Sequence, residues 1–65
     1  MKINRKKYEL ACARACMSFE DIVKTGIPRG TLGNAMRGDD IKPKTIGKIA
    51  KALNCDVTDI LETDN

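Results

Sequence analysis

The sequence contains no histidine and no tryptophan, and aromatic residues make up only 3% of it. Histidine is the commonest general base of enzymes, so the only serine, Ser18, has no base to activate it as a nucleophile. The adjacent acids Glu20–Asp21 and Asp39–Asp40 are expected to be exposed, without the burial that separates the proton affinities of a catalytic pair. We therefore expect no enzyme. A core of aliphatic and sulfur side chains also leaves little room for a deep pocket, so we expect no cofactor and no small-molecule ligand.

Long apolar runs are missing as well. None approaches the ~18 residues that a membrane span needs, and the basic start at Met1–Lys7 lacks the apolar segment of a signal peptide. We expect a cytoplasmic protein without membrane contact. The 3 cysteines form no CxxC pair, and no fourth cysteine or histidine completes a zinc site. Cys12, Cys16 and Cys55 are therefore predicted to be small, reduced core residues, and no metal is expected.

The remaining composition is that of one small folded domain over residues 1–65. Hydrophobic residues make up 42% of the chain, which argues against disorder. The net charge of +3 is unevenly placed. Residues 1–14 and 29–51 are mainly basic, whereas every charge after Lys51 is acidic. One part of the surface is thus expected to attract polyanions and another to repel them.

Apolar periodicity predicts five short helices and no strand, at about residues 5–15, 19–24, 29–37, 44–53 and 57–62. In the first, the expected buried stripe consists of Tyr8, Ala11, Cys12, Ala15 and Cys16. The residues expected to cap the starts of the first, second and fifth helices are Asn4, Ser18 and Asp56. The positions expected to mark other boundaries are Gly26 and Pro28 before the third helix, Gly38 after it, and Pro43 and Asn54 around the fourth.

The most informative stretch is "GIPRGTLGNAMRG" at residues 26–38, which holds four of the chain's 5 glycines. Glycine within a helix costs about 1 kcal/mol relative to alanine, so a loop is the first interpretation. The apolar spacing nevertheless predicts a helix, with Leu32 and Ala35 among the residues on one side. The opposite side carries Arg29, Gly30, Gly33, Asn34 and Arg37. We predict a short amphipathic helix with a bare outer face.

This bare face has the chemistry of a reader of DNA bases. Arginine binds guanine and asparagine binds adenine through paired hydrogen bonds, and residues without bulk between them allow a close approach. The predicted base contacts are Arg29, Gly30, Gly33 and Asn34. A weakly helical, solvated segment is the alternative, and periodicity alone favours neither.

Candidate phosphate contacts surround this face. Basic side chains and helix-start amides are common phosphate donors. The predicted phosphate contacts are Ser18 and Phe19 at the start of the second helix, Arg37 at the end of the third, and Lys42, Lys44 and Thr45 at the start of the fourth.

These residues resemble the helix-turn-helix domain of phage Cro and repressor proteins, the Xre-type family. The similarity rests on the second helix ending before "TGIP", on "TL" at residues 31–32, on Gly38, and on "TIGKIAKALNCDVTDILE" from Thr45 to Glu62. It implies a compact, five-helix, all-α domain of the lambda-repressor type. The third helix would enter the major groove of double-stranded DNA while the second crosses the backbone. The named base and phosphate residues match the family's positions for those contacts.

The resemblance also implies a transcriptional regulator, most often a repressor, that binds palindromic operators as a homodimer. Val57 or Leu61, taken as an exposed apolar residue near the last helix, is the expected dimer contact. Pro28 and Phe19 depart from the family's usual Ser or Thr and Gln. A function from another class is a protein-interaction module, such as an antitoxin-like or accessory subunit, because smooth glycine faces also suit helix packing.

Overall fold

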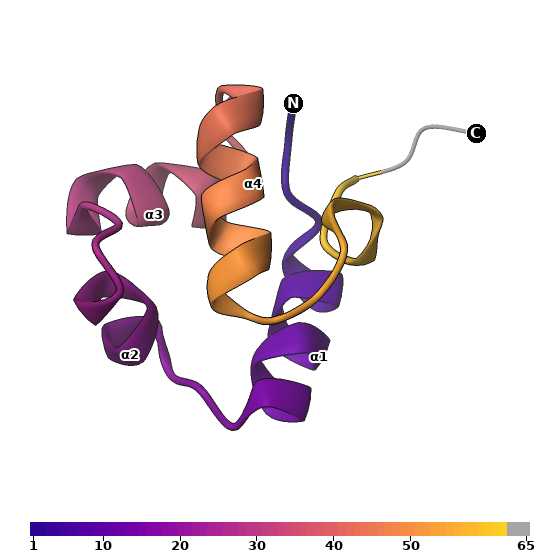
Figure 1. The fold of residues 1–65 in the computed structure, drawn as a ribbon. Helices are drawn as coiled ribbons and strands as arrows, with labels where there is room; N and C mark the ends of the chain where they lie inside the picture. The colour runs from indigo at the N-terminus through magenta and orange to yellow at the C-terminus, as the bar shows by residue number, and fades with distance from the viewer. Residues whose placement is uncertain (63–65) are drawn as a thin grey trace.

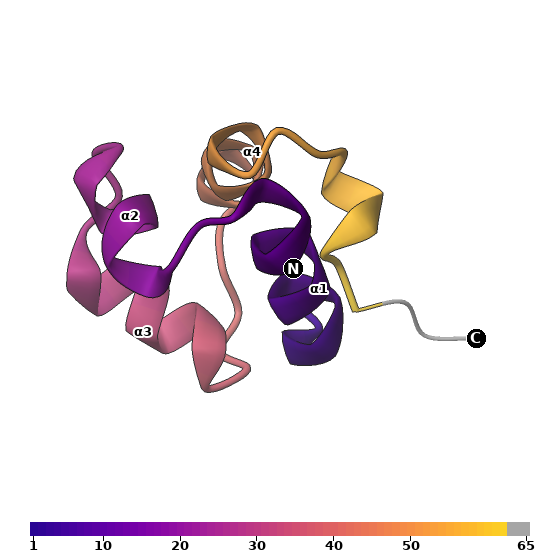
Figure 2. The same ribbon diagram turned by 90° about the horizontal axis from the view of Figure 1, so that it is seen from below.

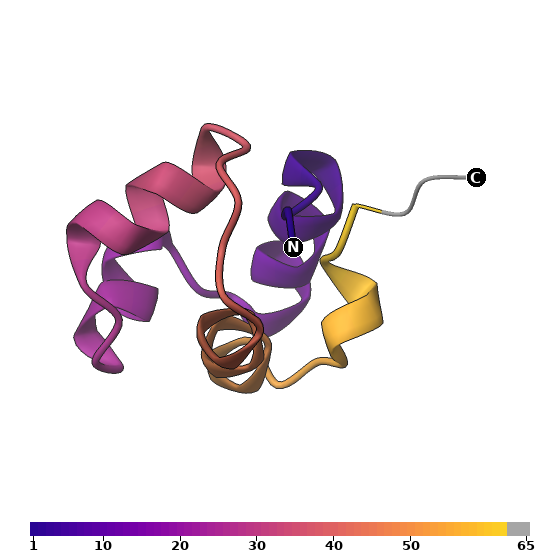
Figure 3. The same cartoon turned by 90° about the horizontal axis from the view of Figure 1, so that it is seen from above.

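The computed structural model describes residues 1–62, which form four α-helices and one 3-10 turn. The elements are α1 (Arg5–Ala15), α2 (Phe19–Lys24), α3 (Arg29–Met36), α4 (Pro43–Ala52) and η1 (Val57–Asp59). Figure 1 shows α2 and α3 at one end of the molecule and η1 at the other, with α1 and α4 between them. The views from below and above, in Figures 2 and 3, keep this order. The predicted all-α class is confirmed, and the first four helices lie within one residue of their predicted bounds.

The predicted fifth helix over 57–62 is wrong in extent. Asp56 caps the turn as expected, with its side chain accepting from the amide of Thr58 at 3.1 Å. The helical turn then stops because the chain becomes extended and pairs with the N-terminal segment. Leu61 forms an isolated antiparallel bridge with Ile3, and the amide of Asn4 donates to the carbonyl of Ile60 at 2.8 Å. This long-range pairing has no periodic signal in the sequence.

The core draws on every element. The largest fully buried side chains are Ile22, Leu32, Ile46, Ile49 and Ile60. Tyr8 and Ala11 of α1 close one side of this cluster, with Cys12 and Ala15 packed partly buried against it. The predicted stripe on α1 is wrong at its last member, because Cys16 is exposed. Cys16 lies beyond the last helical residue in a left-handed conformation with φ of 55°, which turns its side chain away from the stripe.

Caps define most helix boundaries as predicted. Asn4 accepts from the amide of Lys7 at 3.0 Å, and Ser18 and Asp21 form a reciprocal capping box. After α3, the amides of Gly38 and Asp39 donate to the carbonyls of Ala35 and Asn34, a Schellman ending that needs the left-handed φ of 87° at Gly38. Pro43 is the first residue of α4, whereas Pro28 stands just before α3 and is its N-cap.

Candidate nucleic-acid interface

α2, the turn after it and α3 form one helix-turn-helix unit. Each part is anchored by a buried residue: Ile22 in α2, Ile27 in the turn and Leu32 in α3. The turn is closed by the amide of Gly26, which donates to the carbonyl of Val23 at 3.1 Å. Gly26 has φ of 113°, a value that side chains rarely tolerate, as predicted for this position. The unit is therefore fixed to the core at three successive points.

The outer face of α3 is bare at both of its glycines. A Cβ atom built at Gly30 or at Gly33 meets no atom within 4 Å. Neither glycine has a positive φ. The backbone conformation and the packing around these two positions therefore do not require glycine. On the inner side of the same helix, Leu32 and Ala35 are buried. The predicted amphipathic helix is present, with glycine on the side that faces open space.

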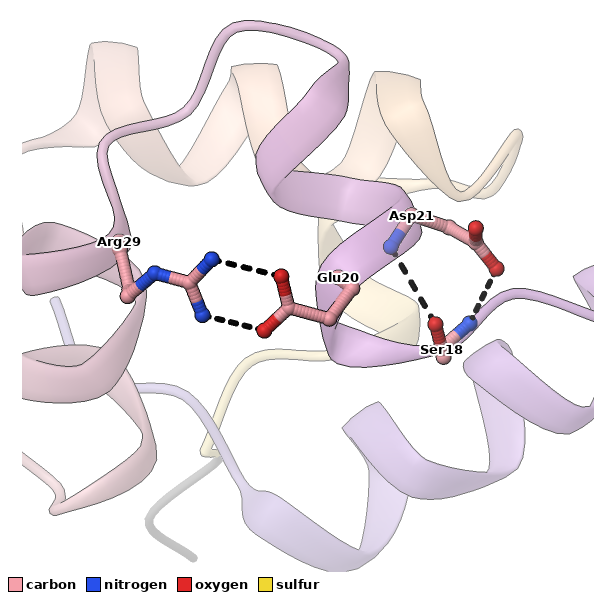
Figure 4. Close-up of polar contacts among 4 residues, drawn as sticks. All are labelled: Ser18, Glu20, Asp21 and Arg29. Atoms are coloured by element: carbon pink, nitrogen blue, oxygen red, sulfur yellow. Dashed lines mark hydrogen bonds and ion pairs between the residues drawn. The ribbon is translucent and has the colours of Figure 1, made fainter.

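Arg29, at the start of this face, is engaged by an acid on the preceding helix. Its two terminal nitrogens donate to the two carboxylate oxygens of Glu20, with Nη2 to Oε1 at 2.6 Å. Figure 4 shows the two groups meeting end to end across the gap between α2 and α3. The side chains are 60% and 54% exposed, so solvent screens the pair. Hydrogen bonding from Arg29 lowers the pKa of Glu20, which keeps the carboxylate charged.

Asn34 and Arg37, at the other end of the face, contact each other. Arg37 donates through Nη2 to Oδ1 of Asn34, and also lies 3.6 Å from a carboxylate oxygen of Asp39. The amide nitrogen of Asn34 takes no part in this contact, so donors remain for another partner. Both arginines of the interface are thus paired with acids in the unbound protein.

The start of α4 offers donors of a different kind. No side chain caps this helix, and Pro43 occupies its first position. Lys42 and Lys44 are exposed, and the described residues include no ion pair to either of them. Thr45 follows, half-buried, with its amide bonded to the carbonyl of Lys42 at 3.0 Å. Two lysine charges and the positive end of the helix dipole therefore lie together at this end.

The start of α2 is already internally bonded. The Ser18 hydroxyl accepts from the amide of Asp21 at 3.2 Å, and the Ser18 amide donates to the Asp21 carboxylate at 2.9 Å (Figure 4). The bond from the Ser18 amide to the carboxylate lowers the pKa of Asp21. The ring of Phe19 packs against the core, so its backbone amide is the group it can offer to a phosphate.

A comparison with protein-family models matches residues 2–65 to the Cro/C1-type HTH DNA-binding domain. The chain belongs to this family. Searches of curated proteins and of solved structures gave no match. This Cro/C1-type domain is therefore a DNA-binding domain of a regulatory class. None of its described helices is long and apolar enough to cross a membrane.

Sequence reasoning missed the acids that pair with the arginines of this Cro/C1-type domain. Glu20 and Asp39 were predicted only to be exposed acids that form no catalytic pair. A signal for the pairing of Glu20 with Arg29 does exist, because these residues lie in the first turns of the two helices of one helix-turn-helix unit. Opposite charges at the starts of two helices joined by a tight turn can meet, but the turn geometry has to be known first.

Charge is distributed differently at the two ends of the domain. The helix-turn-helix end is mixed, because Glu20 and Asp39 accompany Arg29 and Arg37, while Asp56 and Asp59 lie exposed at the η1 end. Figure 1 places those two ends on opposite sides of α1 and α4. The expected attraction of polyanions to one part of the surface stays a prediction.

Val57 and Leu61, the expected dimer contacts, are both partly buried against the core. The exposed large apolar residues of the described chain are instead Met1 and Leu10, at 46% and 58%. The expectation that Val57 or Leu61 is an exposed apolar contact is thus wrong in its premise, while the homodimer itself stays a prediction.

Proposed function

We propose that this domain is a sequence-specific regulator that binds double-stranded DNA by inserting α3 into the major groove. The observation that carries the proposal is the outer face of α3, where the Cβ positions of Gly30 and Gly33 open into empty space. A helix with side chains is about 10–12 Å wide and the major groove about 12 Å. Two glycines on the outer face allow the backbone to approach the base edges more closely than a fully substituted helix could.

Within this proposal, Arg29 and Asn34 read base edges while Gly30 and Gly33 provide the close approach. Arg29 suits the two acceptors of guanine, and Asn34 suits the acceptor and donor of adenine. They stand at the two ends of the bare face, so they would read different base pairs. The rigid anchoring of α3 through Leu32 supports the proposal, because a fixed helix loses little freedom on binding.

Phosphate contacts are proposed on both sides of α3. Lys42 and Lys44 are the strongest candidates, since both are exposed and unpaired within residues 1–62. Thr45 and Arg37 lie beside them in the chain. At the start of α2, the hydroxyl of Ser18 and the backbone amide of Phe19 are the remaining candidates. Contacts of this kind position the domain and carry no sequence information.

A homodimeric repressor is the finer form of the proposal. Arg29 and Asn34 are few side chains for specifying a site, so two copies on a palindromic operator would double the number of base pairs read. A dimer seated on a promoter blocks access to it without any further part. Titrating the protein against a palindromic duplex and its half-site tests this step, with two copies per palindrome expected.

Base reading is tested with a duplex that the wild-type domain selects from a random pool. Arg29→Ala and Asn34→Ala are expected to lower its affinity about 5- to 100-fold, and affinity for random duplex much less. The matched control is Arg5→Ala, which removes an exposed, ion-paired arginine from α1. Equal losses on selected and random duplex for Arg29→Ala and Asn34→Ala would contradict base reading.

Salt separates this function from a protein-interaction module. Binding through several phosphates releases counterions, so affinity should fall steeply as salt rises, whereas an apolar protein interface should be little affected. Lys42→Ala and Lys44→Ala should each lower the slope of affinity against salt without changing base preference. A flat salt response would contradict a DNA-backbone interface.

A further inference from the structure

Glu20 is the least expected residue of the interface. A carboxylate beside a phosphate backbone normally weakens binding, yet Glu20 lies in the first turn of α2, directly after the proposed phosphate contacts Ser18 and Phe19. It is held there by the end-to-end pair with Arg29. An acid at a helix start is common because it favours the helix dipole. That reason does not explain why Glu20 binds Arg29, the proposed base contact, with both carboxylate oxygens.

The geometry of the pair leaves part of Arg29 available. A guanidinium has five N–H donors in a fixed planar fork, and Glu20 takes one from each terminal nitrogen. The Nε–H and the other hydrogens of the terminal nitrogens stay free. In Figure 4 the Nε of Arg29 lies on the side of the guanidinium away from the carboxylate. Together with a neighbouring terminal nitrogen, it forms a second edge with two parallel donors.

We propose that Glu20 is a positioning residue that fixes the guanidinium of Arg29 so that its Nε edge is presented to a guanine of the operator. The inference rests on the proposed base contact of Arg29. A guanine presents two acceptors, O6 and N7, on its major-groove edge, which matches a two-donor edge. Glu20 and guanine can then bind two different edges of the same planar group.

Competition between Glu20 and guanine is the opposite interpretation, and the exposure of the pair argues against it. Exposed ion pairs are weak, whereas a paired arginine–guanine contact discriminates strongly between bases. Glu20 is therefore too weak a partner to withhold Arg29 from DNA. It is strong enough to reduce the rotamers that a long side chain samples before binding, which is a cost that binding otherwise has to meet.

The test measures affinity for the duplex selected by the wild-type domain and for each of its single base-pair variants. Glu20→Ala should reduce the preference for guanine about 2- to 10-fold at the base pair that Arg29→Ala also affects. Glu20→Gln should give an intermediate loss, because its amide accepts one hydrogen bond without the charge. Glu20→Ala added to Arg29→Ala should cause no further loss of base preference.

Glu9→Ala is the matched control, since Glu9 pairs with Arg5 on α1 at 3.9 Å and carries the same charge. It should leave base preference unchanged, and its affinity for random duplex reports the general effect of removing one negative charge. Thermal unfolding of each variant separates a stability effect from positioning, because positioning affects base preference at unchanged folding.

Two results would overturn the inference while leaving the proposed function in place. One is unchanged or stronger guanine preference in Glu20→Ala, which means that Glu20 is irrelevant or competes. The other is an equal loss of preference from Glu20→Ala in the Arg29→Ala background, which means that Glu20 acts elsewhere. If Arg29→Ala alone changes no base preference, the proposed function itself is wrong at this residue.

Discussion

α3 and α4 are neighbouring helices of eight and ten residues with opposite uses of their surface. α4 buries Ile46, Ile49 and Ala50 and presents lysines outside, a strongly amphipathic arrangement. α3 buries Leu32 and Ala35, and its outside carries glycine. The apolar side of each helix holds it on the core. The two helices differ on their solvent-facing sides, where α4 carries lysines and α3 carries glycines.

The difference teaches that the cost of glycine in α3 is confined to the side away from the core. Gly47 in α4 also has open space at its Cβ position, so glycine alone does not mark an interface. What distinguishes α3 is that its two glycines lie between Arg29 and Asn34. Under the proposed function, folding stability and DNA approach are served by opposite sides of this one short helix.

The largest effects on stability are expected from the core residues of the two helices. Leu32→Ala in α3 and Ile49→Ala in α4 should each lower the free energy of unfolding by about 2–5 kcal/mol, because each side chain is fully buried. Denaturant unfolding followed by circular dichroism measures both. A loss at Leu32 far smaller than at Ile49 would mean that α3 is loosely held, contrary to the rigid helix that base reading needs.

The outer glycines of α3 are expected to affect DNA binding, whereas Gly47 of α4 is not. Replacing both Gly30 and Gly33 with alanine should raise the free energy of unfolding by roughly 0.5–1 kcal/mol per site, since each alanine favours helix and meets no atom. The same double variant should bind the selected duplex more weakly, because two methyl groups would enter the groove. Gly47→Ala is the control, with a similar gain in stability and unchanged DNA affinity. Unchanged binding by the double variant would remove the close approach from the proposal.

Helix ends extend the comparison to α1. α3 and α4 are followed by Gly38 and Asn54, which suit a left-handed conformation, whereas α1 is followed by Cys16 with φ of 55°. Cys16→Gly should therefore raise the free energy of unfolding by about 1 kcal/mol. Asn54→Gly, at φ of 54°, should change it less. Thermal unfolding compares the two variants, and a larger gain at Asn54 would contradict this account.

Acid sensitivity should be the smallest effect, and it should arise outside α3 and α4. Asp21 and Asp56 cap α2 and η1, and hydrogen bonds from backbone and hydroxyl groups lower the pKa of each below the usual 3.8. A lowered pKa in the folded state stabilises above the unfolded value, so stability should decline as pH falls below about 3.8. Asp21→Asn should remove the contribution of Asp21, because an amide does not titrate. An equal acid response in that variant would show that Asp21 does not contribute.

Much of the candidate site could be predicted because its signals are local. Periodicity places Leu32 inward and Gly30 outward, and both positions are found as predicted. Caps such as Ser18 depend on neighbours three residues away, so they can also be predicted from the sequence. The partner of Arg29 was not predicted, because it depends on how α2 and α3 are turned toward each other. The contacts of Arg37 with Asn34 and Asp39 were not predicted either, although they are local. The fifth helix was overestimated because Leu61 pairs with Ile3 across almost the whole chain.

By itself the sequence determined the all-α class, four helix positions, the side-chain caps of α1, α2 and η1, and the family. These follow from interactions between residues one to four positions apart, which do not depend on distant parts of the chain. Tertiary structure alone decided that Arg29 meets Glu20 and that Leu61 pairs with Ile3. Those outcomes depend on the angle of each turn and on the competition among distant segments for the same core and backbone groups, which a linear pattern does not encode locally.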